Sequence, residues 1–223
     1  MQVAPGIYTV TWGNGWGNMG LNVGVSVGED GLLLVDAQEE AGLSRLIARI
    51  AEITDKPVRY VVDTHWHFDH VGGNATFAKQ GAAIIAQENT RARLMTEQPN
   101  PLGRATQKAF AAAFWPRITF TGSLTLHVNG DDVELLHFAN GHTDGDAIVF
   151  FHKANVLFAA DEYREVMVAL RDRITRLIKE GKTLSEAIAA RPTRDFDAHW
   201  ANGPIRPDQL VEEIYADLKR TVR

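Results

Sequence analysis

The sequence predicts a mixed α/β protein, because short apolar runs typical of buried strands alternate with segments whose apolar residues recur at helical spacing. Residues 32–35 and 58–62 are runs of the first kind, and residues 41–53 carry leucines and isoleucines three or four positions apart. The chain has 223 residues, of which 45% are hydrophobic, enough for an ordinary globular core. We therefore expect one domain over residues 1–223.

The expected elements follow from periodicity and turn residues. In the first half, strands are predicted at 7–12, 21–27, 32–35, 58–62 and 82–86, and helices at 41–53, 72–81 and 88–115, the last interrupted at 99–103. In the second half, strands are predicted at 118–120, 124–128, 133–138, 147–151 and 156–159, and helices at 164–180, 183–190 and 207–220. Asn129-Gly130 marks a hairpin turn, and Thr183 with Glu186 forms a capping box.

Charge and composition exclude several classes of protein. Lys plus Arg number 23 against 28 Asp plus Glu, a net charge of −5, so we expect no nucleic-acid partner. No apolar stretch is long enough to cross a bilayer, so we expect no membrane association. The first residues do not resemble a signal peptide, so the chain is expected to be cytoplasmic, or periplasmic or secreted with its leader removed. Cysteine is absent, so any metal site must use histidine and carboxylate ligands.

One short segment concentrates metal-ligand side chains. The run His65-Trp66-His67-Phe68-Asp69-His70 follows a predicted buried strand. In extended chain, residues i and i+2 point the same way, so His65 and His67 can share one ion. Asp69 and His70 follow in the turn that opens the next helix, towards a second ion. Imidazole and carboxylate suit zinc. Polar residues at a strand end are the alternative interpretation.

This pattern resembles the signature of the metallo-β-lactamase superfamily. The similarity extends over nearly the whole chain. Residues 28–36 resemble the early strand pair of that family, 140–146 resemble the loop that bears its third histidine, and 156–161 resemble the strand whose final aspartate bridges two metals. The resemblance implies a four-layer αββα sandwich with the metals at one edge between the sheets.

The resemblance also implies a set of ligands for one or two zinc ions. The first ion would be held by His65, His67 and His142, and the second by Asp69 and His70, with Asp161 bridging the two. Asp36 is expected to orient a ligand or a turn.

The chain departs from the family pattern after Asp161. The family supplies one more histidine from a later loop, and here the chain passes almost at once into the helix predicted at 164–180. The C-terminal part of the sandwich is thus expected to be abbreviated. The second zinc could bind weakly or not at all, or His199 or Glu162 could replace the ligand. Apolar surface left uncovered could be covered by a second copy in a homodimer.

The function implied is that of a zinc-dependent hydrolase. A metal-bound hydroxide would attack a small-molecule amide, lactam, ester or thioester, with Asp69 orienting the water or acting as general base. A truncated member that binds metal with weak or no catalysis is the alternative, and an iron-dependent oxidoreductase is a third interpretation. Trp12 or Trp16, in a Gly/Asn-rich segment, could form an apolar wall for substrate or belong to a plain turn.

Overall fold

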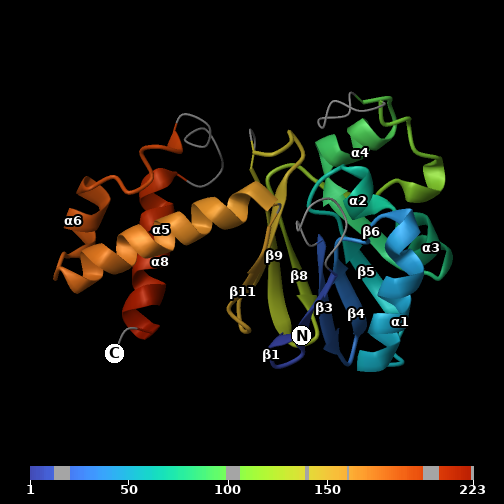
Figure 1. Cartoon of the computed structure of the whole chain (residues 1–223), viewed down its shortest axis with the longest axis horizontal. Helices are drawn as coiled ribbons and strands as arrows, with labels where there is room; N and C mark the ends of the chain where they lie inside the picture. Colours follow the sequence, from blue (N-terminus) through green and yellow to red (C-terminus); the bar gives the residue numbers. More distant parts are fainter. Residues whose placement is uncertain (13–20, 99–105, 139–140, 160, 198–205, 222–223) are drawn as a thin grey trace. The chain divides into compact units, whose positions relative to one another are not determined.

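Two β-sheets organise residues 1–159 (Figure 1). The structure is a computed structural model that describes residues 1–12, 21–98, 106–138, 141–159, 161–197 and 206–221. The larger sheet has the order β1-β2-β3-β4-β5-β6-β7, and the smaller has the order β11-β10-β9-β8. The described residues divide into two compact units, one of residues 1–137 and 145–159 and one of residues 138–144 and 160–223. The single domain expected from the sequence stays a prediction.

The larger sheet is antiparallel in its first half and parallel in its second. Strands β4 to β7 run parallel, which places their carboxyl ends at one edge of the sheet. Its strands are β1 (Gln2–Ala4), β2 (Ile7–Trp12), β3 (Leu21–Gly28), β4 (Gly31–Val35), β5 (Val58–Val62), β6 (Ala83–Gln87) and β7 (Ile118–Phe120). The antiparallel smaller sheet contains β8 (Ser123–Val128), β9 (Asp131–His137), β10 (Ala147–Phe151) and β11 (Val156–Phe158).

Alternate residues of the central strands serve two different cores. Leu32 and Leu34 of β4 pack in a cluster with helices on one face of the larger sheet. Leu33 and Val35 pack in a second cluster, between the two sheets. Because successive side chains of a strand point to opposite faces, an uninterrupted apolar run is what a strand buried on both faces requires. This explains why the run at 32–35 predicts its strand without any alternation.

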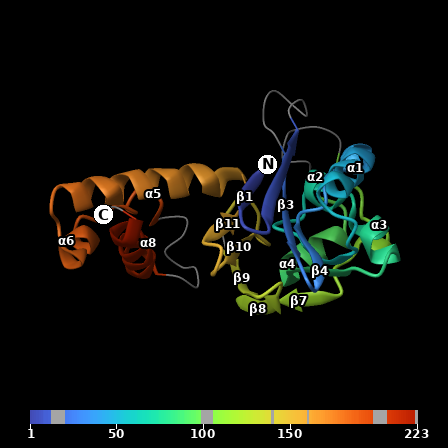
Figure 2. The same cartoon turned by 90° about the horizontal axis from the view of Figure 1, so that it is seen from below.

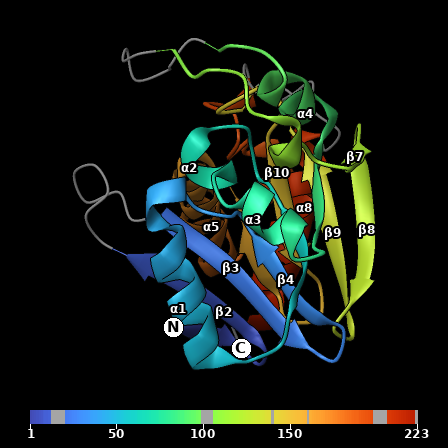
Figure 3. The same ribbon diagram turned by 90° about the vertical axis from the view of Figure 1, so that its right-hand side faces the viewer.

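Helices cover one face of the larger sheet, and the smaller sheet covers the other (Figures 2 and 3). The helices of this unit are η1 (Glu40–Gly42), α1 (Leu43–Ile53), α2 (Phe68–Val71), α3 (Asn74–Lys79), α4 (Glu88–Leu94) and η2 (Ala112–Phe114). In Figure 3, α1 and α3 lie over the face that β3 and β4 present. The unit thus contains a helical layer followed by two sheet layers.

The second unit is helical. It contains α5 (Asp161–Lys179), α6 (Leu184–Ala189) and α8 (Pro207–Thr221). Ile174 and Ile178 of α5 pack with Val211 and Tyr215 of α8 in a core of their own. The predicted capping box is confirmed at the start of α6, where the side chains and backbones of its two residues bond reciprocally. In the part of the chain that the structure describes, no helix is both long and apolar enough to span a bilayer.

Most predicted elements are confirmed, and one helix is wrong. Residues 88–115 were expected to resume a helix after the interruption at 99–103. Instead α4 ends at Leu94, and only the short turn η2 forms among the described residues near 112. The backbone N–H of Phe110 donates to the carbonyl of Leu94, and Trp115 and Phe110 join a cluster around Trp66. Long-range aromatic packing therefore outweighs the local helical spacing in this segment.

The Asn129 side chain helps to join the two sheets at the end remote from the carboxyl termini of the parallel strands, where the Asn129 N–H also donates to the Asp30 carboxylate (2.7 Å). Asn129 and Gly130 form the predicted turn between β8 and β9, with positive φ of 55° and 73°. The Asn129 side chain accepts from the Asp30 N–H (3.1 Å) and donates to Ser26 Oγ and the Gly31 carbonyl (3.1 Å each). One turn residue thus bonds the smaller sheet to the β3–β4 hairpin.

We expect Asn129→Ala to lower the free energy of unfolding by roughly 2–3 kcal/mol, because three hydrogen bonds between sheets are lost at about 1 kcal/mol each. Urea unfolding followed by circular dichroism measures the change. Asn155→Ala is the matched control, because Asn155 also has a positive φ (52°) but its turn joins β10 and β11 within one sheet. An equal loss in both variants would show that backbone conformation, and not the bonds between sheets, explains the effect.

Candidate metal centre

The segment with the metal-ligand motif begins where the parallel strands end. After β5, the Asp63 N–H donates to the carbonyl of Ile85, and the Asp36 N–H donates to the carbonyl of Val62, so the ends of β4, β5 and β6 stay together. Residues 64–66 then form a bend, and α2 starts at Phe68. The motif is therefore a connection between elements, at the sheet edge where open α/β sheets present their functional groups.

Asp36 organises this bend from the end of β4. Its carboxylate accepts from the Thr64 N–H (2.8 Å), from Thr64 Oγ (2.9 and 3.0 Å) and from His70 Nδ1 (2.9 Å), and Asp36 is 5% exposed. Its φ of 67° lies in the left-handed region, which aspartate tolerates better than most residues. The expectation that Asp36 orients a turn is confirmed by its bonds to Thr64, and its bond to His70 lets it orient that predicted ligand as well.

These bonds fix the tautomers of two histidines. A carboxylate only accepts, so the hydrogen of the His70 ring lies on Nδ1 and Nε2 carries the lone pair. Thr64 Oγ gives its one hydrogen to Asp36 and therefore accepts from His65 Nδ1, 3.1 Å away. His65 Nε2 likewise carries a lone pair. One carboxylate, that of Asp36, thus leaves a lone pair on Nε2 of both imidazoles, which is what metal ligation through Nε2 requires.

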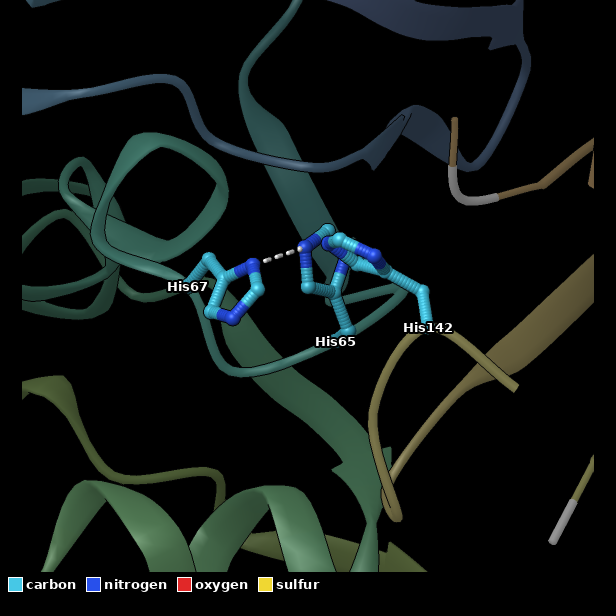
Figure 4. Close-up of side chains that lie close together, drawn as sticks. All are labelled: His65, His67 and His142. Atoms are coloured by element: carbon cyan, nitrogen blue, oxygen red, sulfur yellow. Dashed lines mark hydrogen bonds between the residues drawn. The ribbon is translucent and has the colours of Figure 1, made fainter. Parts of the chain in front are cut away.

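Three histidine side chains converge beyond this network (Figure 4). His65 and His67 come from the bend, and His142 comes from the loop between β9 and β10. One ligand atom of each lies within 4.8 Å of the others. The rings of His65 and His67 are edge to face, with Nε2 of the first 3.1 Å from Nδ1 of the second. Among the described residues, this is the group of three or more His, Cys, Asp or Glu side chains that could hold a metal ion.

The donor set and its spacing fit zinc. Zinc binds imidazole nitrogen at about 2.0–2.1 Å in a tetrahedron, which puts two nitrogens of one site roughly 3.3 Å apart. The 3.1 Å separation between His65 Nε2 and His67 Nδ1 matches that spacing. His65 and His67 are 1% and 7% exposed, so binding an ion replaces few contacts with water. Three neutral imidazoles with an open fourth position are the ligand set of a catalytic zinc site.

The residues predicted for a second ion are only partly brought together. Asp69 Oδ2 lies 3.8 Å from His70 Nε2, and the rings of His65 and His70 are 4.0 Å apart between centroids. Asp69 and His70 are therefore adjacent to the triad. Asp161 does not end a strand as expected, because β11 ends at Phe158 and Asp161 opens α5. Its side chain lies outside the described residues, so its bridging role stays a prediction.

Asp63, which directly precedes the bend, carries a second buried carboxyl group. Asp63 is fully buried, and this burial raises the pKa of its carboxyl well above the ordinary value, against the hydrogen bond from Asn74, which lowers the pKa. Asn74 Nδ2 donates to Asp63 Oδ2 (2.8 Å) and to the carbonyl of Phe114 (3.2 Å). The residue that precedes the bend is therefore tied to the start of α3 and to η2.

Sequence reasoning did not find Thr64, Asn74 or Gln107 as site residues, because threonine, asparagine and glutamine in these contexts have no local signature. Gln107 bonds the backbone beside His67 from about 40 positions further along the chain. Residues 13–20, the Trp12 side chain and residues 198–205 lie outside the described part, so the roles considered for Trp12, Trp16 and His199 are not tested. The Glu162 side chain is also outside it.

Comparison with known proteins establishes the family. The sequence model described as the metallo-beta-lactamase superfamily matches residues 17–181, which is most of the chain. The chain belongs to the metallo-beta-lactamase superfamily. The resemblance inferred from the motif is thereby confirmed.

Two curated relatives with different activities are similar to parts of this sequence. The chain is 24% identical over 258 residues to a linear primary-alkylsulfatase from a Pseudomonas species, covering 83% of this chain and 48% of that protein. It is 27% identical over 137 residues to the alpha subunit of a 2,4-dinitroanisole O-demethylase from a Nocardioides species, covering 60% of this chain and 38% of that protein. The chain spans about half, or less, of the length of these relatives.

Solved structures confirm the fold. A metallo-beta-lactamase from Pontibacter korlensis superposes with a TM-score of 0.59 at 20% identity, covering 71% of this chain and 69% of that one. A metallo-beta-lactamase with a HARLDQ motif from Cronobacter sakazakii gives 0.57 at 18% identity, covering 100% and 93%. The αββα sandwich predicted as the fold class is therefore confirmed.

We expect Asp36→Asn to reverse the tautomer of His70. The new amide nitrogen would donate to Nδ1, so the ring hydrogen would move to Nε2, and asparagine tolerates the positive φ at this position. Long-range ¹H–¹⁵N spectra of the imidazoles in metal-free protein report the tautomer directly. Asn74→Asp is the control, because it alters the polar support of Asp63 without touching His70. An unchanged His70 tautomer in Asp36→Asn would contradict this role for Asp36.

Proposed function

We propose that this protein is a zinc-dependent hydrolase that cleaves an amide, lactam, ester or thioester of a small-molecule substrate. The observation that carries the proposal is the convergence of His65, His67 and His142 beside a buried network that fixes the tautomer of the first. Membership of the metallo-beta-lactamase superfamily supports it. The two curated relatives are named for cleaving a sulfate ester and an O-methyl ether, which supports the broader class of ester and ether cleavage.

Different residues of the chain have different roles in the proposed site. His65, His67 and His142 would hold the ion, and Asp36 keeps the first of these and His70 in the ligating tautomer. A zinc ion held there supplies Lewis acidity and brings the pKa of a water molecule near neutrality. Asp69, 29% exposed in its side chain, is the carboxylate beside the site that would orient that water and accept its proton. Its adjacency to His70 allows a second ion, and this stays a prediction.

A metal-binding protein with weak or no turnover is the second candidate. The observation that favours it is the short path from β11 to α5, with only residues 159–160 between them. This path leaves no room for the last histidine loop that the family resemblance implies. A homodimer in which a second copy covers apolar surface left exposed by the abbreviated fold also stays a prediction.

We expect His67→Ala to abolish stoichiometric zinc and to lower kcat/KM by at least about 100-fold, because loss of residues that merely support a ligand already costs roughly 10- to 100-fold. Metal content is measured by plasma mass spectrometry on purified protein, and turnover with nitrocefin, a nitrophenyl ester, a thioester and an alkyl sulfate. His127→Ala is the matched control, because the His127 side chain is 78% exposed and bonds to Asp132. Unchanged zinc in His67→Ala would reject the site.

Zinc removal should also be visible in stability. A ligand that binds only the folded protein stabilises it by about 2.7 kcal/mol at 100 times its Kd, so chelation should lower Tm and added zinc should restore it. Calorimetry with and without chelator measures the shift. Full zinc occupancy with a restored Tm and no turnover on any substrate would favour the second candidate over the hydrolase.

A further inference from the structure

His67 lies at the junction between the bend and helix α2. It precedes α2, its ψ of 146° is extended, and its side chain makes no capping hydrogen bond. The Phe68 N–H belongs to the first turn of that helix, where amides have no intrahelical partner. The Trp66 carbonyl on the other side belongs to a bend outside both sheets. Helix α2 therefore holds the His67 carbonyl, which accepts from the N–H groups of His70 (3.0 Å) and Val71 (3.3 Å), but provides no partner for the Trp66 carbonyl or the Phe68 N–H.

The side-chain amide of Gln107 bonds both of these backbone groups. Its Oε1 accepts from the Phe68 N–H at 3.1 Å, and its Nε2 donates to the Trp66 carbonyl at 3.3 Å. A glutamine amide presents an acceptor and a donor side by side, as a strand backbone does. Gln107 therefore gives the peptide groups on either side of His67 the two hydrogen bonds that a neighbouring strand would otherwise make.

Gln107 is itself held by a second glutamine. The backbones of Gln98 and Gln107 exchange two hydrogen bonds of 2.9 Å each. Gln98 is 3% exposed, and its side chain bonds to the Arg93 carbonyl and to Thr96 Oγ just after α4. The backbone of Gln107 is thus held by Gln98, which is bonded to residues at the end of α4 and just after it. The position of Gln107 therefore does not depend on the two hydrogen bonds that its own side chain makes to the motif.

We infer that Gln107 is a positioning residue that holds His67 in its ligating orientation. Asp36 fixes the other end of the motif through Thr64, so the two ligands of the bend are constrained from both sides by side chains distant in sequence. The ring of Trp66 packs edge to face on that of His67, 4.4 Å between centroids, so a shift of the Trp66 carbonyl moves the packing as well. The inference rests on the proposed metal site.

The test removes the two hydrogen bonds and keeps the shape. Gln107→Met is expected to weaken zinc binding roughly 10- to 100-fold, the usual effect of losing a group that orients a ligand. Zinc affinity is measured by competition with a chromophoric chelator, and site geometry by the visible absorption of the cobalt(II)-substituted protein. Gln107→Glu keeps the acceptor for the Phe68 N–H and loses the donor to the Trp66 carbonyl. The zinc affinity of this variant should therefore lie between those of the wild type and of Gln107→Met.

Gln87→Met is the matched control, because the side-chain amide of Gln87 also bonds two backbone groups, the Asn89 N–H and the Thr121 carbonyl, but none in the motif. It should lower Tm and leave zinc affinity within about twofold, below the range expected for loss of a group that orients a ligand. Wild-type zinc affinity and cobalt spectrum in Gln107→Met, or an equal loss of affinity in Gln87→Met, would overturn the inference. Loss of zinc in His67→Ala but not in Gln107→Met would support the metal site and reject only the positioning role of Gln107. A wild-type protein that binds no zinc would reject both.

Discussion

The carboxylate of Asp36 is the group on which the rest of the site depends. It accepts hydrogen bonds from the backbone and hydroxyl of Thr64 and from the ring of His70, at the end of a strand that is buried on both faces. A buried carboxylate is costly unless its oxygens are paired, and here the donors that pair with it come from His70 of the metal motif and from Thr64, the residue just before the motif. The motif and the sheet therefore stabilise each other through one residue.

The need for such support arises from where the ligands lie. Side chains that bind a catalytic metal must leave the fourth coordination position open, so they belong on a connection at the sheet edge and not within a strand. A connection lacks the repeating hydrogen bonds of a sheet or helix, and its backbone groups must find other partners. Here Asp36 and Gln107 supply them. The sandwich itself supplies the rigid edge.

The chain belongs to the metallo-beta-lactamase superfamily, and its first 159 residues carry the helical layer and both sheets of that fold. The described segments after β11 are helical and have their own apolar core. The triad of His65, His67 and His142 lies in segments that precede β11. The segments that bring these three histidines together therefore all precede the helical part of the chain.

The sequence by itself predicted most of the strands and placed the side chains of His65 and His67 together. Uninterrupted apolar runs such as 32–35 indicate strands buried on both faces, and the spacing of His65 and His67 places two imidazoles side by side, since both patterns are local. The third histidine of the triad, His142, could be named because the resemblance to the family supplied its loop. Only the tertiary structure showed that residues 106–111 are not helical and that Gln107 bonds the backbone on either side of His67. Those features depend on contacts between positions about 40 residues apart, and a glutamine carries no local pattern that specifies its distant partner.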